Sequence, residues 1–328
     1  MKVLITGGAG FIGGHAAVAF AERGYHVTIA DNFARARHDS FLRRLAARVN
    51  VEVTDIDLLQ PDAVRDVPDD FEMIVHLAAI IGVRHVNARP YATLCDNTAM
   101  TANAIEIARC QSALTRFVFA STSEVTAAAV ATGAGVPTPE ETTLVLPELS
   151  QQRTTYMLSK VYGEAMTVHA GLPYTIIRPH NVYGPRMGMS HVVPELMKRA
   201  AAAEQNGCLE VYSPSHSRAF CYVDDAVAQL CALTESRAGE GGTFNVGNQD
   251  EEIAVADLAR RVCGVTGRND LRVAEMADTP GSPPRRCPDM TRTIETTGLG
   301  ANTPLSDGLQ LTYAWYRDVF AEREVSAL

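Results

Sequence analysis

The stretch Lys2-Val-Leu-Ile-Thr-Gly-Gly-Ala-Gly-Phe-Ile-Gly13 decides the fold of this chain. A short apolar run ends in glycines at positions 7, 10 and 13, and an amphipathic helix pattern follows. A strand, turn and helix of this kind bring bare backbone against a pyrophosphate and point the helix N-terminus at its negative charge. Gly7 permits the tight turn, Gly10 lets the phosphates approach, and Gly13 lets the helix pack on the strand.

The next strand supplies an acid at the distance that such a turn requires. The strand-like run 26–31 ends at Asp31, 18 residues past Gly13. A carboxylate there accepts hydrogen bonds from the adenosine ribose hydroxyls, and its charge disfavours a 2′-phosphate. The sequence therefore predicts NAD as the cofactor. NADP is the alternative that the nearby Arg35 and Arg37 would favour, and a glycine turn without a ligand is the other.

Composition limits the class of protein and its partners. A chain of 328 residues with 46% hydrophobic content suits one large α/β domain, or a nucleotide domain with a smaller lobe. A net charge of −9 argues against nucleic acid or an anionic membrane as partner. We see no signal peptide, no apolar run of about 18 residues, and seven scattered cysteines without metal-type spacing. We expect a soluble cytoplasmic protein without a metal site.

Strand-like and helix-like segments alternate through the first half of the chain. The strand-like runs are 2–6, 26–31, 50–54, 73–77, 116–120 and 174–178, and the helix-like segments are 12–23, 39–47, 92–111 and 155–170. This alternation predicts an α/β protein with a Rossmann-type doubly wound parallel sheet.

The rhythm changes after about residue 180, where helices (192–204, 224–236) and short strands (209–212, 243–246) lack regular crossovers. We therefore expect an NAD-binding domain over residues 1–180. A smaller mixed α/β substrate region should cover 181–328, with some C-terminal segments returning to the sheet. Residues 127–150 are predicted to form a surface loop.

Tyr156 and Lys160 stand four residues apart at the start of a predicted helix, so their side chains share one face. A phenol has a pKa near 10, too high for a base at neutral pH. An ammonium one turn away, together with the positive nicotinamide of an oxidised cofactor, should lower that pKa. Lys160 can also hold the nicotinamide ribose. The spacing is common by itself and gains its meaning from the dinucleotide-binding turn upstream.

Polar residues follow the strand 116–120 directly. Ser121, Thr122, Ser123 and Glu124 stand at the carboxyl edge of the predicted parallel sheet, where such folds bind ligands. A hydroxyl there can bind a substrate alcohol while Tyr156 removes its proton. A carboxylate can act as general acid or base on a neighbouring carbon. Capping and turn formation are the alternative roles for the hydroxyls, and a solvated loop acid is the alternative for the glutamate.

Together these features resemble the extended short-chain dehydrogenase/reductases that modify nucleotide sugars. The matching residues are Gly7–Gly13, Asp31–Asn32, Asp55–Ile56, His76–Ala79, Asn97, Ser121–Glu124, Tyr156 with Lys160, Asn181–Arg186, Arg218–Asp225 and Arg285–Asp289. The implied cofactor contacts are Gly7, Gly10, Phe11, Ile12, Gly13, Asp31, Asn32, Asp55, Ile56, Leu77, Ala78, Ala79, Asn97, Tyr156 and Lys160. The implied substrate contacts are Asn181, His191, Arg218 and Arg286. The resemblance also implies a homodimer formed through the helices 92–111 and 155–170.

Members of this family share a first step, in which the tyrosine takes the proton of the sugar C4 hydroxyl while the C4 hydride moves to NAD. The next step depends on local residues. Thr122-Ser123-Glu124 looks like the pattern of UDP-glucuronate decarboxylases and of GDP-mannose 4,6-dehydratases. Arg285-Arg-Cys-Pro-Asp289 looks like the decarboxylase pattern, which places Arg286 near the sugar carboxylate.

The preferred interpretation is therefore a UDP-glucuronate decarboxylase that forms UDP-4-keto-pentose or UDP-xylose. A nucleotide-sugar 4-epimerase, a 4,6- or 5,6-dehydratase, and a non-catalytic NAD(H)-sensing protein are the alternatives. Two departures bear on the sugar. Val125-Thr126-Ala127 replaces the usual Val-Tyr-Gly, and His191 stands where decarboxylases carry a second substrate-facing arginine. Histidine is the weaker anion anchor at neutral pH. Uridine is favoured by its prevalence in the family.

Overall fold

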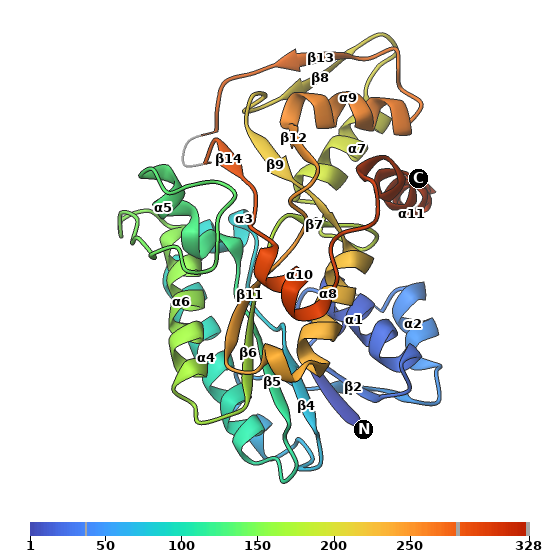
Figure 1. Ribbon diagram of the computed structural model, residues 1–328. Helices are drawn as coiled ribbons and strands as arrows, with labels where there is room; N and C mark the ends of the chain where they lie inside the picture. Colours follow the sequence, from blue (N-terminus) through green and yellow to red (C-terminus); the bar gives the residue numbers. More distant parts are fainter. Residues whose placement is uncertain (37, 280–282, 326–328) are drawn as a thin grey trace.

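A computed structural model describes residues 1–36, 38–279 and 283–325 of the chain (Figure 1). Seven parallel strands form the central sheet. In sheet order they are β11 (Gly242–Val246), β6 (Tyr174–Pro179), β5 (Arg116–Ala120), β4 (Met73–His76), β1 (Lys2–Thr6), β2 (His26–Asp31) and β3 (Val51–Asp55). The chain leaves β1 in one direction, toward β3, and then crosses back to β4 on the other side. This reversal opens a crevice at the carboxyl ends of β1 and β4, and it confirms the predicted doubly wound sheet.

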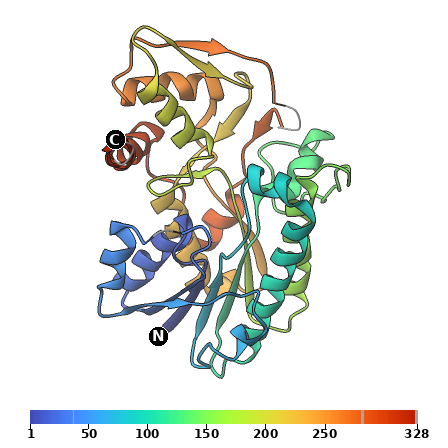
Figure 2. The ribbon, with the colours of Figure 1, turned by 180° about the vertical axis from the view of Figure 1, so that it is seen from behind.

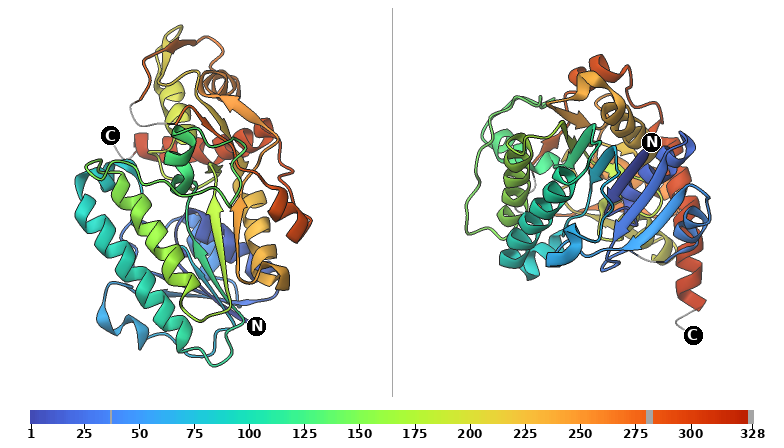
Figure 3. Two further views of the ribbon diagram at one scale, coloured as in Figure 1. Left: turned by 60° about the vertical axis from the view of Figure 1, so that its left-hand side comes forward. Right: turned by 90° about the horizontal axis from the view of Figure 1, so that it is seen from below.

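The sheet buries a separate apolar core on each face. Successive residues of β1 point to opposite faces, so Val3 and Ile5 belong to one core and Leu4 to the other. Helices α1 (Phe11–Glu22), α2 (Ser40–Ala46) and α8 (Val223–Glu235) contribute to the first core, and α4 (Pro90–Arg109) to the second. Helix α6 (Thr154–Val168) lies beside α4 on the outer side (Figure 3). Figure 2 shows the same arrangement from behind.

A smaller region lies over the carboxyl edge of the sheet, at the top of Figure 1. Its strands are β7 (Val182–Tyr183) with β10 (Cys221–Tyr222), β8 (Cys208–Val211) with β13 (Arg272–Glu275), and β9 (Ser217–Ala219) with β12 (Glu252–Ala254) and β14 (Arg285–Arg286). Its helices are α7 (Val192–Ala202), α9 (Val255–Val265) and α11 (Leu305–Val325). The remaining elements are α3 (Val83–Ala88), α5 (Ala127–Ala131), α10 (Thr291–Thr297), η1 (Pro61–Val64), η2 (Ser123–Thr126) and η3 (Arg237–Gly239). None of the helices in the described ranges combines the length and apolar character needed to span a membrane.

The segment 127–150 was wrongly predicted to be a surface loop throughout. Its first five residues form α5, because alanine is the strongest helix former. Further on, Thr138 and Glu140 are buried. The Thr138 amide donates to the Cys287 carbonyl over 2.9 Å, and Glu140 accepts the Asn245 amide of β11 over 2.7 Å. Long-range hydrogen bonds of this kind leave no pattern in the local sequence.

A buried ion pair fixes α6 against the sheet. Glu164 of α6 accepts two hydrogen bonds from Arg178 of β6, over 2.9 and 2.7 Å, and a third from the Ser121 hydroxyl over 2.5 Å. Gly163 brings the same helix close to β5, because a Cβ there would collide with the Phe119 ring. These contacts set the position of Tyr156 and Lys160, which lie on α6.

Replacing Glu164 with glutamine should therefore destabilise the fold by about 3 kcal/mol, since it leaves a buried guanidinium without its counter-charge. Urea unfolding followed by circular dichroism measures the change. The exposed pair of Asp62 with Arg65 is the matched control. Asp62→Asn should leave the unfolding free energy almost unchanged, and equal effects of the two substitutions would contradict this account of α6.

Candidate functional site

A crevice of about 1830 Å³ opens at the carboxyl edge of the sheet. It is lined on one side by the loops that follow β1, β2, β4 and β5, and on the other by the segment 186–192 and the strands of the smaller region. Pockets for one small ligand are typically about 300–1,000 Å³. This crevice therefore has room for a dinucleotide and a second ligand of similar size.

The glycine turn forms the floor of the crevice. Gly7 has a φ of +70°, and a Cβ there would lie 2.7 Å from the Ala78 amide nitrogen. A Cβ on Gly13 would collide with the Gly7 carbonyl oxygen, so α1 can pack on β1 because both positions lack side chains. Gly10, Phe11 and Ile12 line the crevice where α1 begins. The N–H groups of a first helical turn have no partner within the helix and suit an anion.

Asp31 lies at the end of β2, beside this turn. One carboxylate oxygen accepts the Ala9 amide over 3.1 Å, and the other accepts the Phe33 amide over 2.9 Å. Burial raises the pKa of Asp31, and these two amides act against that shift. Each oxygen keeps a lone pair for a ribose hydroxyl. The turn and this acid together fit the ribose and diphosphate of NAD.

The other predicted cofactor residues divide between the crevice and its support. Asn32, Ile56 and the run Leu77, Ala78 and Ala79 line the crevice. Asp55 is exposed at the end of β3, outside this lining. Asn97 lies one layer behind, where its side chain accepts the Ile80 amide over 2.7 Å and donates to Ser159 over 3.2 Å. The structure thus brings most of this set together, and Arg37 falls outside the described residues.

Tyr156 and Lys160 both reach the crevice from α6, but their electrostatics differ from the prediction. The Lys160 ammonium donates to the Ala120 carbonyl over 2.8 Å and lies 5.1 Å from the centre of the Phe119 ring. Burial lowers the pKa of Lys160 to about 8. Burial and the charge of Glu124 raise the pKa of Tyr156 above its ordinary value. Lys160 is not among the groups whose charge lowers the pKa of Tyr156 here, so the predicted lowering would rest on the other predicted charge, that of an oxidised nicotinamide.

Two other groups lower the pKa of Tyr156. The Thr122 side chain hydrogen-bonds to Tyr156, and the guanidinium of Arg35 attracts the phenolate. Thr122 also caps η2 by accepting the Glu124 amide over 3.3 Å. Ser123 is buried at the same edge of the crevice, whereas the Ser121 hydroxyl is bonded to Glu164.

Glu124 lies between two arginines. Arg153 donates to it over 3.0 Å from the position just before α6, and the half-buried Arg286 of β14 is attracted to the same carboxylate. Burial lowers the pKa of Arg286, and repulsion from Arg153 adds to this shift. Sequence reasoning missed Arg153. Its signal was its place three residues before Tyr156, which carries meaning only once Glu124 is known to lie opposite.

Arg218 and Arg286 are side by side in register on β9 and β14. Burial, followed by repulsion from Arg286, lowers the pKa of Arg218 to about 10. Arg218 also donates to the Pro283 carbonyl over 2.7 Å. Asn181, with a φ of +41°, donates to the Ala219 carbonyl over 2.9 Å at the base of these strands. Two adjacent guanidinium groups suit a ligand with several negative charges, such as a diphosphate.

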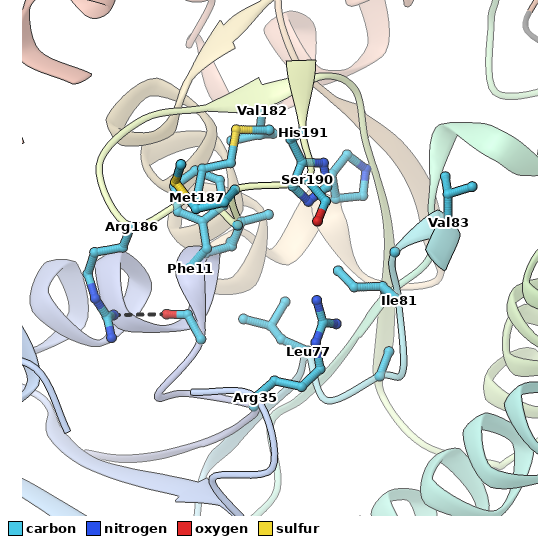
Figure 4. A pocket seen from close by; sticks show the side chains of 18 of the residues that line it. Phe11, Arg35, Leu77, Ile81, Val83, Val182, Arg186, Met187, Ser190 and His191 are labelled. Carbon is cyan, nitrogen blue, oxygen red and sulfur yellow. Dashed lines mark hydrogen bonds between the residues drawn. The ribbon is translucent and has the colours of Figure 1, made fainter. Parts of the chain in front are cut away.

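His191 and Arg35 lie on opposite sides of the end of the crevice that contains Tyr156. Figure 4 shows Arg35 and Leu77 on one side and Ser190 and His191 on the other. Burial lowers the pKa of His191, and the charge of Arg35 lowers it further, so this histidine is neutral. One of the Arg35 guanidinium nitrogens would lie 3.8 Å from a Cβ on Gly82, and the charge of this group acts on Tyr156 and His191.

Comparisons with known proteins agree with this geometry. Residues 3–247 match the NAD dependent epimerase/dehydratase family. A UDP-N-acetyl-alpha-D-glucosaminuronate decarboxylase of Bacillus cytotoxicus is 30% identical over 97% of this chain and 98% of its own. UDP-glucuronic acid decarboxylase 1 of Xenopus tropicalis is 30% identical over 96% of this chain and 72% of its own. The crystal structure of UDP-glucuronic acid 4-epimerase from Bacillus cereus, in complex with UDP-glucuronic acid and NAD, has a TM-score of 0.83 at 25% identity, covering 97% of this chain and 100% of that one.

The charge of Arg35 should be measurable at Tyr156. Because this guanidinium lowers the pKa of the phenol, Arg35→Met should raise that pKa and shift the acid limb of the kcat–pH profile to higher pH. At neutral pH, turnover of a nucleotide sugar should fall roughly three- to tenfold. Arg44→Met, which removes an exposed arginine of α2 at the other end of the crevice, should leave the limb in place. An unshifted limb in Arg35→Met would contradict the assignment.

Proposed function

Because the chain belongs to the NAD dependent epimerase/dehydratase family, we propose that it is a UDP-hexuronate decarboxylase, with UDP-glucuronate as its substrate. The observation that carries the proposal is the position of Glu124 between Arg153 and Arg286, beside Tyr156. This arrangement combines a proton carrier with cations that suit a sugar carboxylate. The names of two relatives, a UDP-glucuronic acid decarboxylase and a UDP-N-acetylglucosaminuronate decarboxylase, support the same substrate class.

The crevice supplies a cation for each negative group of such a substrate. Arg218 would bind the diphosphate, with Asn181 beside it. Arg286 and Arg153 would bind the carboxylate on C5, where bidentate guanidinium pairing fixes its orientation. His191 is neutral and would donate a hydrogen bond to the sugar or diphosphate without adding charge.

Tyr156 would begin the reaction by taking the proton of the C4 hydroxyl, while Thr122 and Ser123 hydrogen-bond to the same oxygen. Bound NAD supplies the hydride acceptor at C4 and the hydride donor for any return step. Lys160 and Asp31 would hold the two ribose groups of that cofactor. The product of this step is a C4 ketone, and its carbonyl lies β to the carboxylate on C5.

The ketone makes the C5 carboxylate a leaving group. The bond between C5 and the carboxyl carbon breaks, carbon dioxide departs, and the electron pair forms an enolate with the C4 oxygen. Tyr156, now protonated, and Arg286 would stabilise that oxygen. A proton taken up from solvent would pass through Glu124, positioned by Arg153, to C5 and give UDP-4-keto-pentose. Return of the hydride to C4, with the proton of Tyr156, would give UDP-xylose.

A UDP-hexuronate 4-epimerase is the second candidate. This candidate is supported by the crystal structure of UDP-glucuronic acid 4-epimerase, which matches almost the whole length of this chain. It would use the same anion contacts and the same first step, and would return the hydride to the opposite face of C4 without breaking a carbon–carbon bond. A 4,6- or 5,6-dehydratase would instead release water, and an NAD(H) sensor would transform no nucleotide sugar.

Mass spectrometry of products distinguishes these reactions. After incubation with UDP-glucuronate, UDP-N-acetylglucosaminuronate and neutral UDP-, GDP-, CDP- and dTDP-sugars, we expect loss of carbon dioxide from UDP-glucuronate. Tyr156→Phe should reduce that turnover about a thousandfold or more, with NAD still bound. Glu124→Gln should slow the formation of UDP-4-keto-pentose, which needs protonation of C5, more than it slows hydride transfer, which is followed by NADH absorbance. An isomeric product of unchanged mass would assign the chain to the epimerases, and loss of water to the dehydratases.

We also propose a cytoplasmic homodimer that pairs α4 and α6 of two copies. The seven unpaired cysteines suit a reducing compartment. Both helices lie on the outer side of the fold, and Tyr91, Tyr162 and Val168 expose 81%, 55% and 44% of their surface there (Figure 3). Exposed large apolar side chains of this kind suit a protein interface.

Analytical ultracentrifugation tests the dimer. The wild-type protein should sediment at twice the mass of one chain. Tyr162→Glu should yield monomers, because it places a charge in the centre of the paired helices. Leu311→Glu is the matched control, since Leu311 is 52% exposed on α11, away from α4 and α6. A monomeric wild-type protein would overturn the dimer and leave the proposed reaction untouched.

A further inference from the structure

Arg186 joins the smaller region to the glycine turn. Its side chain is buried against the turn, where it also lines the crevice, and donates three hydrogen bonds: from Nε to Asp39 over 2.8 Å, from Nη1 to the Gly10 carbonyl over 3.0 Å, and from Nη2 to the Ala9 carbonyl over 3.0 Å. The guanidinium also stacks 4.5 Å from the centre of the Phe41 ring. Figure 4 places Arg186 across the pocket from Ile81 and Val83. This guanidinium therefore ties the carbonyls of the turn to the segment that leads into the smaller region.

Two features show that the contact between Arg186 and the glycine turn has a free-energy cost. The backbone of Arg186 has a φ of +68°, a left-handed conformation that is unfavourable for residues other than glycine. Gly14 in α1 leaves the room that the guanidinium occupies, because a Cβ there would lie 2.5 Å from Arg186 Nη1. Asp39 serves twice, since its other oxygen caps α2 by accepting the Leu42 amide over 2.8 Å.

The contact determines which way the turn presents its N–H groups. In a trans peptide the carbonyl and the N–H point in opposite directions. The Gly10 carbonyl accepts the Arg186 guanidinium and, within α1, the Gly14 amide over 3.1 Å, so the N–H of the same peptide unit, which belongs to Phe11, points away from both donors. Phe11 lines the crevice at the first turn of α1. An N–H fixed in that direction is a preorganised donor for a diphosphate.

Arg186 also lies in the middle of the segment 181–191, whose ends carry Asn181 and His191. A second tie to α1 runs through the same segment, where His15 Nε2 contacts the Pro185 carbonyl at 3.2 Å. From the other side, the Tyr316 hydroxyl of α11 donates to the Met187 carbonyl. A displacement of the segment 181–191 would therefore also displace the glycine turn.

We propose that Arg186 is a positioning residue that orients the glycine turn toward the cofactor diphosphate and thereby couples the binding of NAD to the binding of a nucleoside diphosphate sugar. The coupling rests on the substrate role proposed for the segment 181–191. The effect on the cofactor does not, and the two are measured separately.

The first experiment measures binding of NAD, ADP and adenosine to the full-length apoprotein by calorimetry. Arg186→Met should weaken NAD and ADP about tenfold or more, because a donor held by charge-assisted hydrogen bonds is released. Adenosine, which has no diphosphate, should bind as it does to the wild type. Equal loss for all three ligands would show a general structural defect and overturn the proposal, and so would no loss for any of them.

Gly14→Ala provides a variant that keeps the arginine. The added Cβ should displace the guanidinium from the Gly10 carbonyl while favouring the helix, since alanine has the higher helix propensity. NAD and ADP should therefore weaken several-fold without a fall in Tm. In the Arg186→Met background, Gly14→Ala should cause no further loss. Additive effects of the two substitutions would mean that they act independently and would contradict the proposed mechanism.

Arg268 is the matched control. It makes the same kind of contacts as Arg186, with Asp270 on its Nε over 2.9 Å and the Ala200 and Ala203 carbonyls on Nη1 over 2.8 Å, but it lies outside the crevice. Arg268→Met should lower Tm and leave the NAD affinity unchanged. A comparable loss of NAD affinity in this variant would show that any arginine with several side-chain hydrogen bonds has the same effect.

The coupling is measured with UDP as the second probe. In the wild type, saturation with NAD should increase the affinity for UDP several-fold. In Arg186→Met this increase should disappear, even at NAD concentrations that saturate the variant. Equal coupling in both proteins would overturn this half of the proposal. Because no turnover is needed, failure of the proposed decarboxylation would leave both binding experiments interpretable.

Discussion

The site depends on one close approach of backbone to backbone at the first turn. Gly7 and Gly13 touch across this turn, and Gly7 also meets the backbone of Ala78 at the end of β4. A side chain would not fit at either contact. Because none is present, β1, β4 and α1 approach one another more closely than elements separated by side chains could. The crevice opens where these elements meet. Asp31 is held to the same turn by the Ala9 amide, so the ribose acid and the diphosphate donors form one rigid unit.

The crevice is rich in arginine, although the protein as a whole is negatively charged. The chain carries a net charge of −9, yet Arg35, Arg153, Arg218 and Arg286 all line this space. Partial burial lowers the pKa of Arg218 and Arg286, which reflects the free-energy cost of removing a guanidinium from water. A polyanionic ligand offsets that cost, and a neutral ligand does not. The arrangement thus disfavours neutral ligands as well as favouring anionic ones.

Residues whose role depends on local spacing were predictable from the sequence. The glycine triplet, Asp31, and Tyr156 with Lys160 all follow from one strand–turn–helix unit or one helical turn, and the structure places each of them at the crevice. The contacts of Arg153, Arg186 and Arg35 were not predictable. They join residues as far apart as 177 positions, as in the hydrogen bond from Arg186 to Ala9. Such pairs depend on the packing of the smaller region over the sheet, which leaves no local signal.

The protonation state of Tyr156 depends on the charges of the groups around it. Burial and Glu124 both disfavour the phenolate, and Lys160 is turned toward the Ala120 carbonyl. Arg35 offsets only part of this, because the pKa of the phenol stays raised. An oxidised nicotinamide would supply further positive charge. In the proposed reaction Tyr156 would then be a base before hydride transfer, and a weak acid that retains its proton once that charge is neutralised. A protein in which Lys160 alone ionised the phenol would lose this distinction, since its base would be present in both redox states. A raised pKa of Tyr156 would thus keep the proton available for the return of the hydride.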